Sequence, residues 1–193
     1  MLKKVALPSG QFHKSSFLSC EKDCNTIIRK LFVESRPYSD ELKKLLVINT
    51  KDCLTNTDSQ IIKDKIKEMT PAKLYQDGYI RLVPKLIMPD HEEIKSYIIL
   101  TFDNFYETDN PQFRDCTVHF DILCHTDYWD LGNFQLRPLK IAGYIDGILN
   151  NTKLSGIGTL QFNNCKELLL DENLSGYTLT YIATHGSDDS IEL

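Results

Sequence analysis

The sequence predicts an α+β fold in which a mainly antiparallel sheet is packed by one long helix and preceded by a helical N-terminal extension. Three observations predict it. Apolar residues recur at helical spacing in the first third of the chain. The segment Phe113–His125 alternates apolar and polar side chains, as a strand with one buried face does. One amphipathic segment, beginning near Leu136, separates this strand from a group of shorter predicted strands.

Length and composition limit the class of protein. The 193 residues suffice for one domain with a substantial core, and the formal net charge of −5 lacks the basic surplus of a nucleic-acid-binding protein. The N-terminal residues MLKKVALPSGQFHKSSF contain no apolar run typical of a signal peptide, and runs such as Tyr97–Leu100 are too short to span a bilayer. We therefore expect a soluble protein made in the cytoplasm, with no membrane contact and with its 6 cysteines reduced.

The N-terminal part of the chain is predicted to be helical. Residues 1–20 are expected to form an arm and residues 21–76 a helical region. Helical spacing predicts three helices, at Cys20–Glu34, Tyr38–Val47 and Asp58–Met69. Ser39 is the expected N-cap of the second helix, and Pro71 ends the third. If these helices are peripheral, a truncated chain of residues 79–185 should still fold. If the helices belong to the core, that truncated chain should not fold.

Residues 77–185 are predicted to form the α+β core, and residues 186–193 an acidic tail. Segments rich in β-branched and aromatic residues predict strands at Tyr79–Val83, Glu93–Asn104, Phe113–His125, Gly156–Phe162, Lys166–Leu170 and Gly176–Thr184, with a turn at Phe105–Pro111. In the long strand, one face carries Cys116, Val118, Phe120, Ile122 and Cys124, and the other carries Thr117, His119, Asp121 and His125. One apolar and one polar face favour an antiparallel sheet.

The long helix is expected to run from about Leu136 to Asn150. Pro138 fits only in its first turn, where the missing N–H is not needed. The predicted buried stripe consists of Leu139, Ala142, Ile145 and Leu149, widened by Ile141 and Ile148. Asp146 is expected on the outer side of this helix.

Two groups of cysteine and histidine have spacings that suggest a metal site. Cys116 and His119 lie on opposite faces of a strand, as do Cys124 and His125, so neither pair is expected to share a metal ion. Cys20 and Cys24 would lie one helical turn apart, but a metal site needs two further ligands, and none is close in the sequence. The sequence therefore predicts no metal site.

Catalytic patterns are equally incomplete. His119 and Asp121 share the polar strand face, so a hydrolase or metal-dependent enzyme using them with Cys124 is an alternative. No Gly-x-Ser-x-Gly turn accompanies them, and Gly156–Gly158 lacks the rest of a dinucleotide-binding fingerprint. We expect no catalytic residue, no cofactor and no enzymatic activity.

The order of these segments resembles the tail terminator, or tail completion, proteins of tailed bacteriophages and related phage-tail-like particles. The resemblance covers roughly Tyr79–His185 and depends on the strand YIRLVPKL, a pair of long strands, the helix RPLKIAGYIDGILN and the closing strand GYTLTYIAT. It implies a structural virion protein of the tail or neck. Such proteins form a homohexameric ring that caps the tail tube and binds the head-side connector, while genome DNA passes through the ring without specific binding.

This resemblance suggests a role for particular residues in subunit contacts. Tyr128 and Trp129, in the loop Thr126–Asn133, are candidate interface anchors because aromatic residues concentrate at interaction hot spots. Arg137 is expected to form a salt link with a neighbouring subunit or with Asp130. Asp146 is the fourth candidate contact.

The acidic residues near the polar strand face agree with a ring through which DNA passes without binding. A local surplus of acids is formed by Asp103, Glu107, Asp109, Asp115 and Asp121. An acidic face repels the DNA backbone, whereas a basic face would bind it. Another head–tail connector or a tail-tube protein remains the alternative within the same class.

Overall fold

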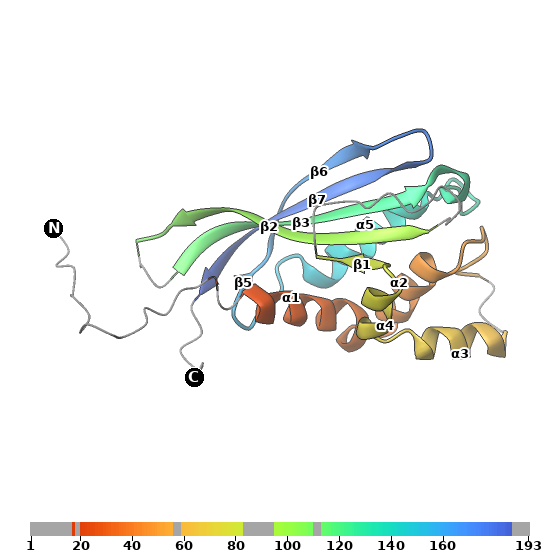
Figure 1. The fold of residues 1–193 in the computed structure, drawn as a ribbon, viewed down its shortest axis with the longest axis horizontal. Coiled ribbons are helices and arrows are strands. Elements are labelled where there is room, and N and C mark those ends of the chain that lie inside the picture. Colours follow the sequence, from red (N-terminus) through yellow and green to blue (C-terminus); the bar gives the residue numbers. More distant parts are fainter. Residues whose placement is uncertain (1–16, 18–19, 56–58, 83–94, 110–112, 187–193) are drawn as a thin grey trace.

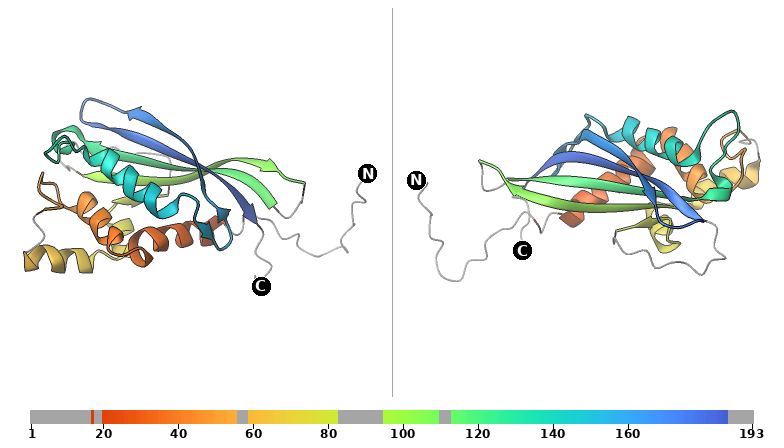
Figure 2. Two further views of the ribbon diagram at one scale, coloured as in Figure 1. Left: turned by 180° about the vertical axis from the view of Figure 1, so that it is seen from behind. Right: turned by 90° about the horizontal axis from the view of Figure 1, so that it is seen from above.

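The computed structural model describes residues 17, 20–55, 59–82, 95–109 and 113–186. Within them, a five-stranded sheet forms one layer and helices gather against one of its faces (Figure 1). Figure 2 shows the same two layers from behind and from above. The predicted α+β class with a mainly antiparallel sheet is confirmed, although several helices, rather than one long helix, pack on the sheet.

Some predicted segments and boundaries fall outside the described residues. These are nearly all of the N-terminal arm and of the acidic tail, the start of the third helix at Asp58, and the strand or loop ends at Val83, Glu93 and Pro111.

The N-terminal part is helical, as predicted. Its elements are α1 (Cys20–Arg29), which continues as the π-helical turn η2 (Lys30–Glu34), α2 (Tyr38–Val47), α3 (Gln60–Glu68) and α4 (Pro71–Gln76). The predicted helices Cys20–Glu34 and Tyr38–Val47 are therefore confirmed. Among the described residues, no helix combines the length and the apolar composition needed to cross a membrane.

Two details of these helices differ from the prediction. Ser39 is not an N-cap: it lies buried inside α2, and Pro37 occupies the cap position without a side-chain bond. Pro71 not only follows the third helix but also begins α4. The hydroxyl of Thr70 caps α4 by accepting a 3.2 Å hydrogen bond from the Lys73 amide, and proline suits the first helical position.

The sheet has the strand order β1-β2-β3-β7-β6. Its strands are β1 (Ile80–Arg81), β2 (Ser96–Glu107), β3 (Phe113–His125), β6 (Gln161–Leu169) and β7 (Leu174–Gly186). Only β1 and β2 are parallel; the other neighbours are antiparallel. The helix α5 (Arg137–Leu149) and a separate hairpin, β4 (Lys153–Leu154) and β5 (Gly158–Thr159), connect β3 to β6.

Two strands are longer than predicted because irregularities carry them through apparent turn signals. β2 continues past Asn104 to Glu107, with a shift in pairing between Asp103 and Tyr106. β6 likewise runs through Asn163 and Asn164, and its register against β7 shifts between Phe162 and Asn164. Both pairs of strands accommodate an extra residue as a β-bulge, so the asparagines do not end the strands.

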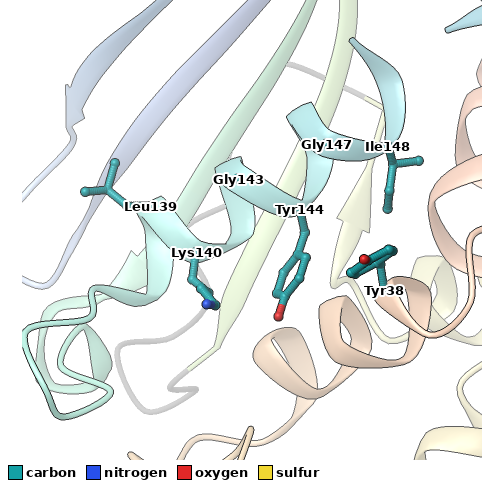
Figure 3. Close-up of a pocket in the computed structure, with 7 residues that line it drawn as sticks. All are labelled: Tyr38, Leu139, Lys140, Gly143, Tyr144, Gly147 and Ile148. Carbon is teal, nitrogen blue, oxygen red and sulfur yellow. The ribbon is translucent and has the colours of Figure 1, made fainter.

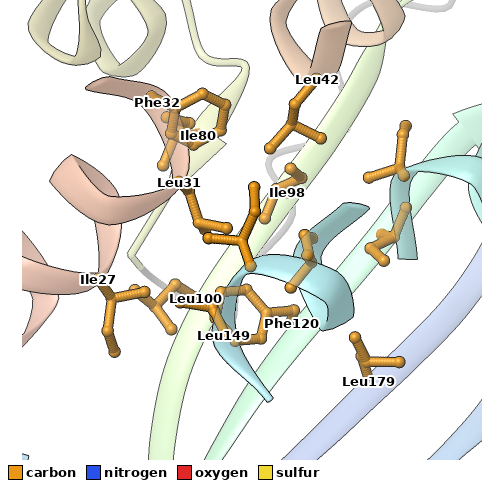
Figure 4. Packing of buried hydrophobic residues seen from close by; sticks show 14 of the residues in the cluster. Ile27, Leu31, Phe32, Leu42, Ile80, Ile98, Leu100, Phe120, Leu149 and Leu179 are labelled. Atoms are coloured by element: carbon orange, nitrogen blue, oxygen red, sulfur yellow. The ribbon is translucent and has the colours of Figure 1, made fainter. Parts of the chain in front are cut away.

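The helices and the sheet share one hydrophobic core (Figure 4). The predicted inner face of β3 is confirmed, since all five residues from Cys116 to Cys124 on that face are buried. They share a cluster with residues of the N-terminal helices and of α5, including Ile27, Leu31, Phe32, Leu42, Leu45 and Leu149. Residues on both sides of position 77 thus exclude water from the same core, so the helices are not a peripheral layer.

The helix α5 contributes most of its predicted stripe. Ile141, Ala142, Ile145, Ile148 and Leu149 are buried as expected. Leu139 is 45% exposed, which corrects the prediction that it is buried. The buried stripe is instead continued towards the N-terminus of the helix by Arg137 and Pro138.

The outer face of the sheet is not uniformly polar. Thr117, His119, Asp121 and His125 are half-buried on it. A second apolar cluster of Tyr97, Ile99, Leu123 and Leu174, with Leu168 packed against it, occupies one part of this face. Leu123 belongs to the face that the alternation predicted to be polar.

The close packing of Gly176 against β3 predicts a strong mutational effect. A Cβ atom on Gly176 of β7 would lie 1.8 Å from the carbonyl oxygen of Ile122 in β3. We expect Gly176→Ala to lower the free energy of unfolding by about 2–3 kcal/mol, because the two strands must separate. Urea denaturation followed by circular dichroism measures this change.

The matched control is Gly143→Ala on α5, where an added Cβ meets no heavy atom within 4 Å. This change should raise the free energy of unfolding by about 0.5–1 kcal/mol through helix propensity. Equal effects of the two substitutions would contradict the packing described for Gly176.

Candidate interaction surfaces

Arg137 lies at the start of α5 with its side chain fully buried. The guanidinium donates to four backbone carbonyls, those of Leu45 (2.6 Å), Ile48 (3.0 Å), Thr50 (2.7 Å) and Tyr128 (2.8 Å). Three of these oxygens belong to the last turn of α2 and the residues after it, where helix carbonyls lack partners and the helix dipole is negative. The buried cation is therefore compensated by oriented carbonyl groups.

The predicted salt link between Arg137 and Asp130 is wrong, because each residue has other partners. The carboxylate of Asp130 lies 2.8 Å from the ammonium of Lys51, on the surface. Because Arg137 is enclosed, it acts as a link between α2, the loop after β3 and α5 within one chain.

The other predicted interface residues also have contacts within the chain. Trp129 covers the end of the sheet: its indole N–H donates to the Cys124 carbonyl at 3.2 Å, and its ring lies 6.3 Å from that of Tyr177. Tyr128 is half-buried beside it. Contacts of Tyr128, Trp129, Arg137 and Asp146 with another subunit stay a prediction.

Asp146 does not lie on the outer side of α5. Its carboxylate accepts a 2.9 Å hydrogen bond from the hydroxyl of Tyr181, a fully buried residue of β7. Burial, together with this carboxylate, raises the pKa of the Tyr181 hydroxyl, so Tyr181 stays a donor. The pair joins α5 to the sheet.

The loop between β3 and α5 exposes an aromatic side chain at its tip. Phe134 is 106% exposed, and it lies in the left-handed region with φ of 60°. The loop is held by hydrogen bonds from the Gly132 amide to the Asp130 carboxylate (2.7 Å) and between Leu131 and Gln135 (2.9 Å). A bulky residue in this backbone region is uncommon, and fully exposing a phenyl ring gives no packing energy in the free chain.

A groove lies between α5 and the start of α2 (Figure 3). Its volume is about 430 Å³, and its apolar lining includes Tyr38, Leu139, Gly143, Tyr144, Gly147 and Ile148. The glycines leave the helix surface open, because an added Cβ at either position meets nothing within 4 Å. The hydroxyl of Tyr144 donates to Glu41 of α2, and Lys140 lies 5.6 Å from the centre of the Tyr144 ring.

The strand β6 forms one edge of the sheet. Among the described strands it pairs only with β7, so no strand covers its other side, and the Phe162 amide donates to the Asn150 side chain at 3.1 Å. Exposed apolar side chains lie on it or directly after it, namely Phe162, Leu169 and Leu170. Leu169 is 70% exposed. Such an edge is a template for another strand.

The polar part of the outer sheet face carries cross-strand pairs. His119 lies 2.9 Å from the Asp103 carboxylate and 3.1 Å from the Thr180 hydroxyl. Asp121 accepts a 2.6 Å hydrogen bond from the Thr178 hydroxyl. His119 and Asp121 thus each bond to neighbouring strands and not to each other.

The residues of the alternative enzyme reading are not gathered into one site. Cys124 lies on the opposite, buried face of β3 from His119 and Asp121. Burial raises the pKa of its thiol to about 11, which disfavours the nucleophilic thiolate. Within the described part of the chain, no three His, Cys, Asp or Glu side chains are grouped so as to hold a metal ion.

Residues 39–183 match the family model named YomW. The chain belongs to the YomW family. This family is phage-derived, which agrees with the bacteriophage origin implied by the sequence resemblance. No curated protein matches the chain.

The part shared with the YomW family begins in α2 and ends in β7. It therefore includes the contact of Arg137 with α2, the Phe134 loop, the β6 edge and the α5 side of the groove, whereas Tyr38 lies one residue before the matched part. The sequence resemblance began only at Tyr79, so it missed α2. The role of α2 could not be read from the sequence, because it depends on a long-range contact: Arg137 bonds to carbonyls some ninety residues earlier.

Removing the Arg137 guanidinium is expected to destabilise the whole chain. Arg137→Met leaves four carbonyls without their donor, and we expect the free energy of unfolding to fall by about 3–5 kcal/mol. Lys51→Met, which breaks only the exposed pair with Asp130, should cost less than about 1 kcal/mol. Chemical denaturation compares the two variants, and similar losses would refute the anchoring role of Arg137.

The buried thiols predict a loss of stability in alkali. Burial raises the pKa of Cys116 to about 12 and that of Cys124 to about 11, from an ordinary 9.0. The native state thus holds these protons more tightly than the unfolded chain, so their stabilising contribution is complete below pH 9.0 and is lost as pH rises above it.

Urea denaturation at about pH 8 and about pH 10 measures this loss. A variant with Cys116→Ala and Cys124→Ala is the control and should show a smaller decrease between the two pH values. An equal decrease in both proteins would show that other groups are responsible.

Proposed function

We propose that this YomW-family protein is a structural, non-enzymatic component of a phage particle that assembles as a homohexameric ring. In this proposal the ring caps the tail tube, as tail terminator proteins do, and contacts the head-side connector. Its location would be the tail or neck of the virion, after synthesis in the host cytoplasm. Membership of a phage-derived family and the sequence resemblance support the proposal.

The observation that carries the proposal is the open edge at β6. Nine residues of extended backbone are paired on one side only among the described strands. The strand carries two charged residues, Lys166 and Glu167, and Leu169 and Phe162 add exposed apolar area. A neighbouring subunit that covers this edge would satisfy the backbone groups and bury the apolar side chains together.

The acids on the outer sheet face fit a channel for DNA. Asp103, Asp115 and Asp121 lie on that face, each bonded through its carboxylate to histidine or threonine. Facing the centre of a ring, these carboxylates would repel phosphate and let the genome pass without binding.

Another head–tail connector or a tail-tube protein would use the same edge, and these functions are the second candidates. They differ in what the assembled protein binds. A terminator forms a closed ring and binds the end of a tail tube, whereas a tube protein continues to polymerise.

A charge on β6 is expected to weaken assembly. Leu169→Lys places an ammonium group at the edge, and we expect association to weaken at least about tenfold, or about 1.4 kcal/mol per contact. Ile61→Lys on α3 is the matched control, because Ile61 is also a largely exposed aliphatic residue (79%, against 70% for Leu169) and lies on another element. Native mass spectrometry gives the size of each assembly.

Electron microscopy of the same proteins with tail tubes tests the capping function. The wild-type chain should form rings at one end of each tube and stop their growth. A wild-type protein that stays a single chain even with tubes present would contradict the proposed function. Continued polymerisation would favour the tube-protein alternative.

A further inference from the structure

We propose that Phe134 of one copy of this chain inserts into the α5 groove of the next copy. The inference rests on the proposed function, since it assigns a specific contact to the same ring. The two participating surfaces are different patches of one molecule. When each copy gives its Phe134 to one neighbour and receives Phe134 from another, the contact is heterologous, and it closes a ring when its fixed rotation divides a full turn.

Phe134 has the properties of an interface anchor. Its ring is fully exposed in the free chain, at the tip of a loop that is tied at both ends. At one end the Asp130 carboxylate holds the Gly132 amide, and at the other the Arg137 amide donates to the Trp129 carbonyl at 2.7 Å. A loop held in this way loses little freedom on binding, so the ring can be buried at low entropic cost.

The groove suits an aromatic side chain in size and chemistry. A volume of about 430 Å³ is at the lower end of pockets that admit small ligands. Its walls offer the rings of Tyr38 and Tyr144 for edge-to-face contact, and Gly143 and Gly147 allow close approach to the helix backbone. Tyr38 is itself 54% exposed, so the groove has apolar area left to bury.

Charge favours a second copy as the occupant. The segment that leads to Phe134 carries Asp127, whose side chain is 75% exposed, while the charge of Asp130 is already matched by Lys51 at 2.8 Å. The groove carries Lys140, which lies over the Tyr144 ring, and beside it Glu41 accepts the hydrogen bond of the Tyr144 hydroxyl. Insertion of Phe134 would bring the exposed carboxylate of Asp127 into one interface with the ammonium of Lys140, and opposite charges of this kind help to fix the orientation of partners.

Two variants separate the two halves of the contact. Phe134→Asn removes the aromatic ring and keeps a residue that tolerates positive φ, so the loop should retain its shape. Gly147→Trp fills the groove from its own helix, where an added side chain meets no neighbouring atom at Cβ. Ile61→Asn and Gly147→Ala are the matched controls for the lost apolar side chain and for the altered helix residue.

Native mass spectrometry of each variant and of their mixture tests the contact. Each variant alone should lose the assembly that the wild type forms at the same concentration, and the controls should retain it. Mixed together, the Phe134→Asn chain supplies an open groove and the Gly147→Trp chain supplies a free phenyl ring. The mixture should therefore form one-to-one dimers and nothing larger.

The outcomes distinguish this contact from the proposed function. Rings that both variants form as well as the wild type does would overturn the contact and leave the capping function standing. Variants that fail alone and also fail to form dimers together would overturn the contact as well. A wild-type chain that stays single in the presence of tail tubes would overturn both.

Discussion

The fold depends on one buried cation, Arg137. Isolated charges are costly in a protein interior, yet this guanidinium is enclosed, with four carbonyl oxygens as acceptors. Three of them come from the end of α2 and beyond, so the first turn of α5 also completes the C-terminal end of another helix. The contact forms only when helices and sheet are docked together. It therefore couples the N-terminal helices to the rest of the core, in which they share one hydrophobic cluster.

The same anchor positions the surfaces on which the functional proposals depend. The side chain of Arg137 donates to the Tyr128 carbonyl and its amide to that of Trp129, which fixes the chain on the β3 side of the Phe134 loop. The helix that Arg137 begins carries the groove, and the Asp146–Tyr181 hydrogen bond holds that helix to the sheet. An exposed aromatic side chain and an apolar groove are thus presented on a rigid frame, as binding surfaces require.

Strand parity and helical periodicity were enough to predict the fold class, the inner face of β3 and most of the α5 stripe, because local patterns report which side of an element is buried. These patterns gave wrong predictions for residues whose burial depends on a partner far away in the sequence. Leu139 is exposed because Arg137 and Pro138 take its expected place in the interior, and Asp146 faces inward because Tyr181 donates to it. No local pattern marks Phe134 either, since its exposure follows from a turn of three successive positive-φ residues.

Hydrogen exchange in the dilute and the assembled protein is the most direct test of the central claim, that this chain is a subunit whose function depends on contacts at β6, the Phe134 loop and the α5 groove. We predict that amides in Gln161–Leu169, in residues 131–136 and in residues 139–148 gain protection on assembly, while those of α3 do not change. Protection confined to the outer faces of β2 and β3, or no change in these three segments, would contradict the account.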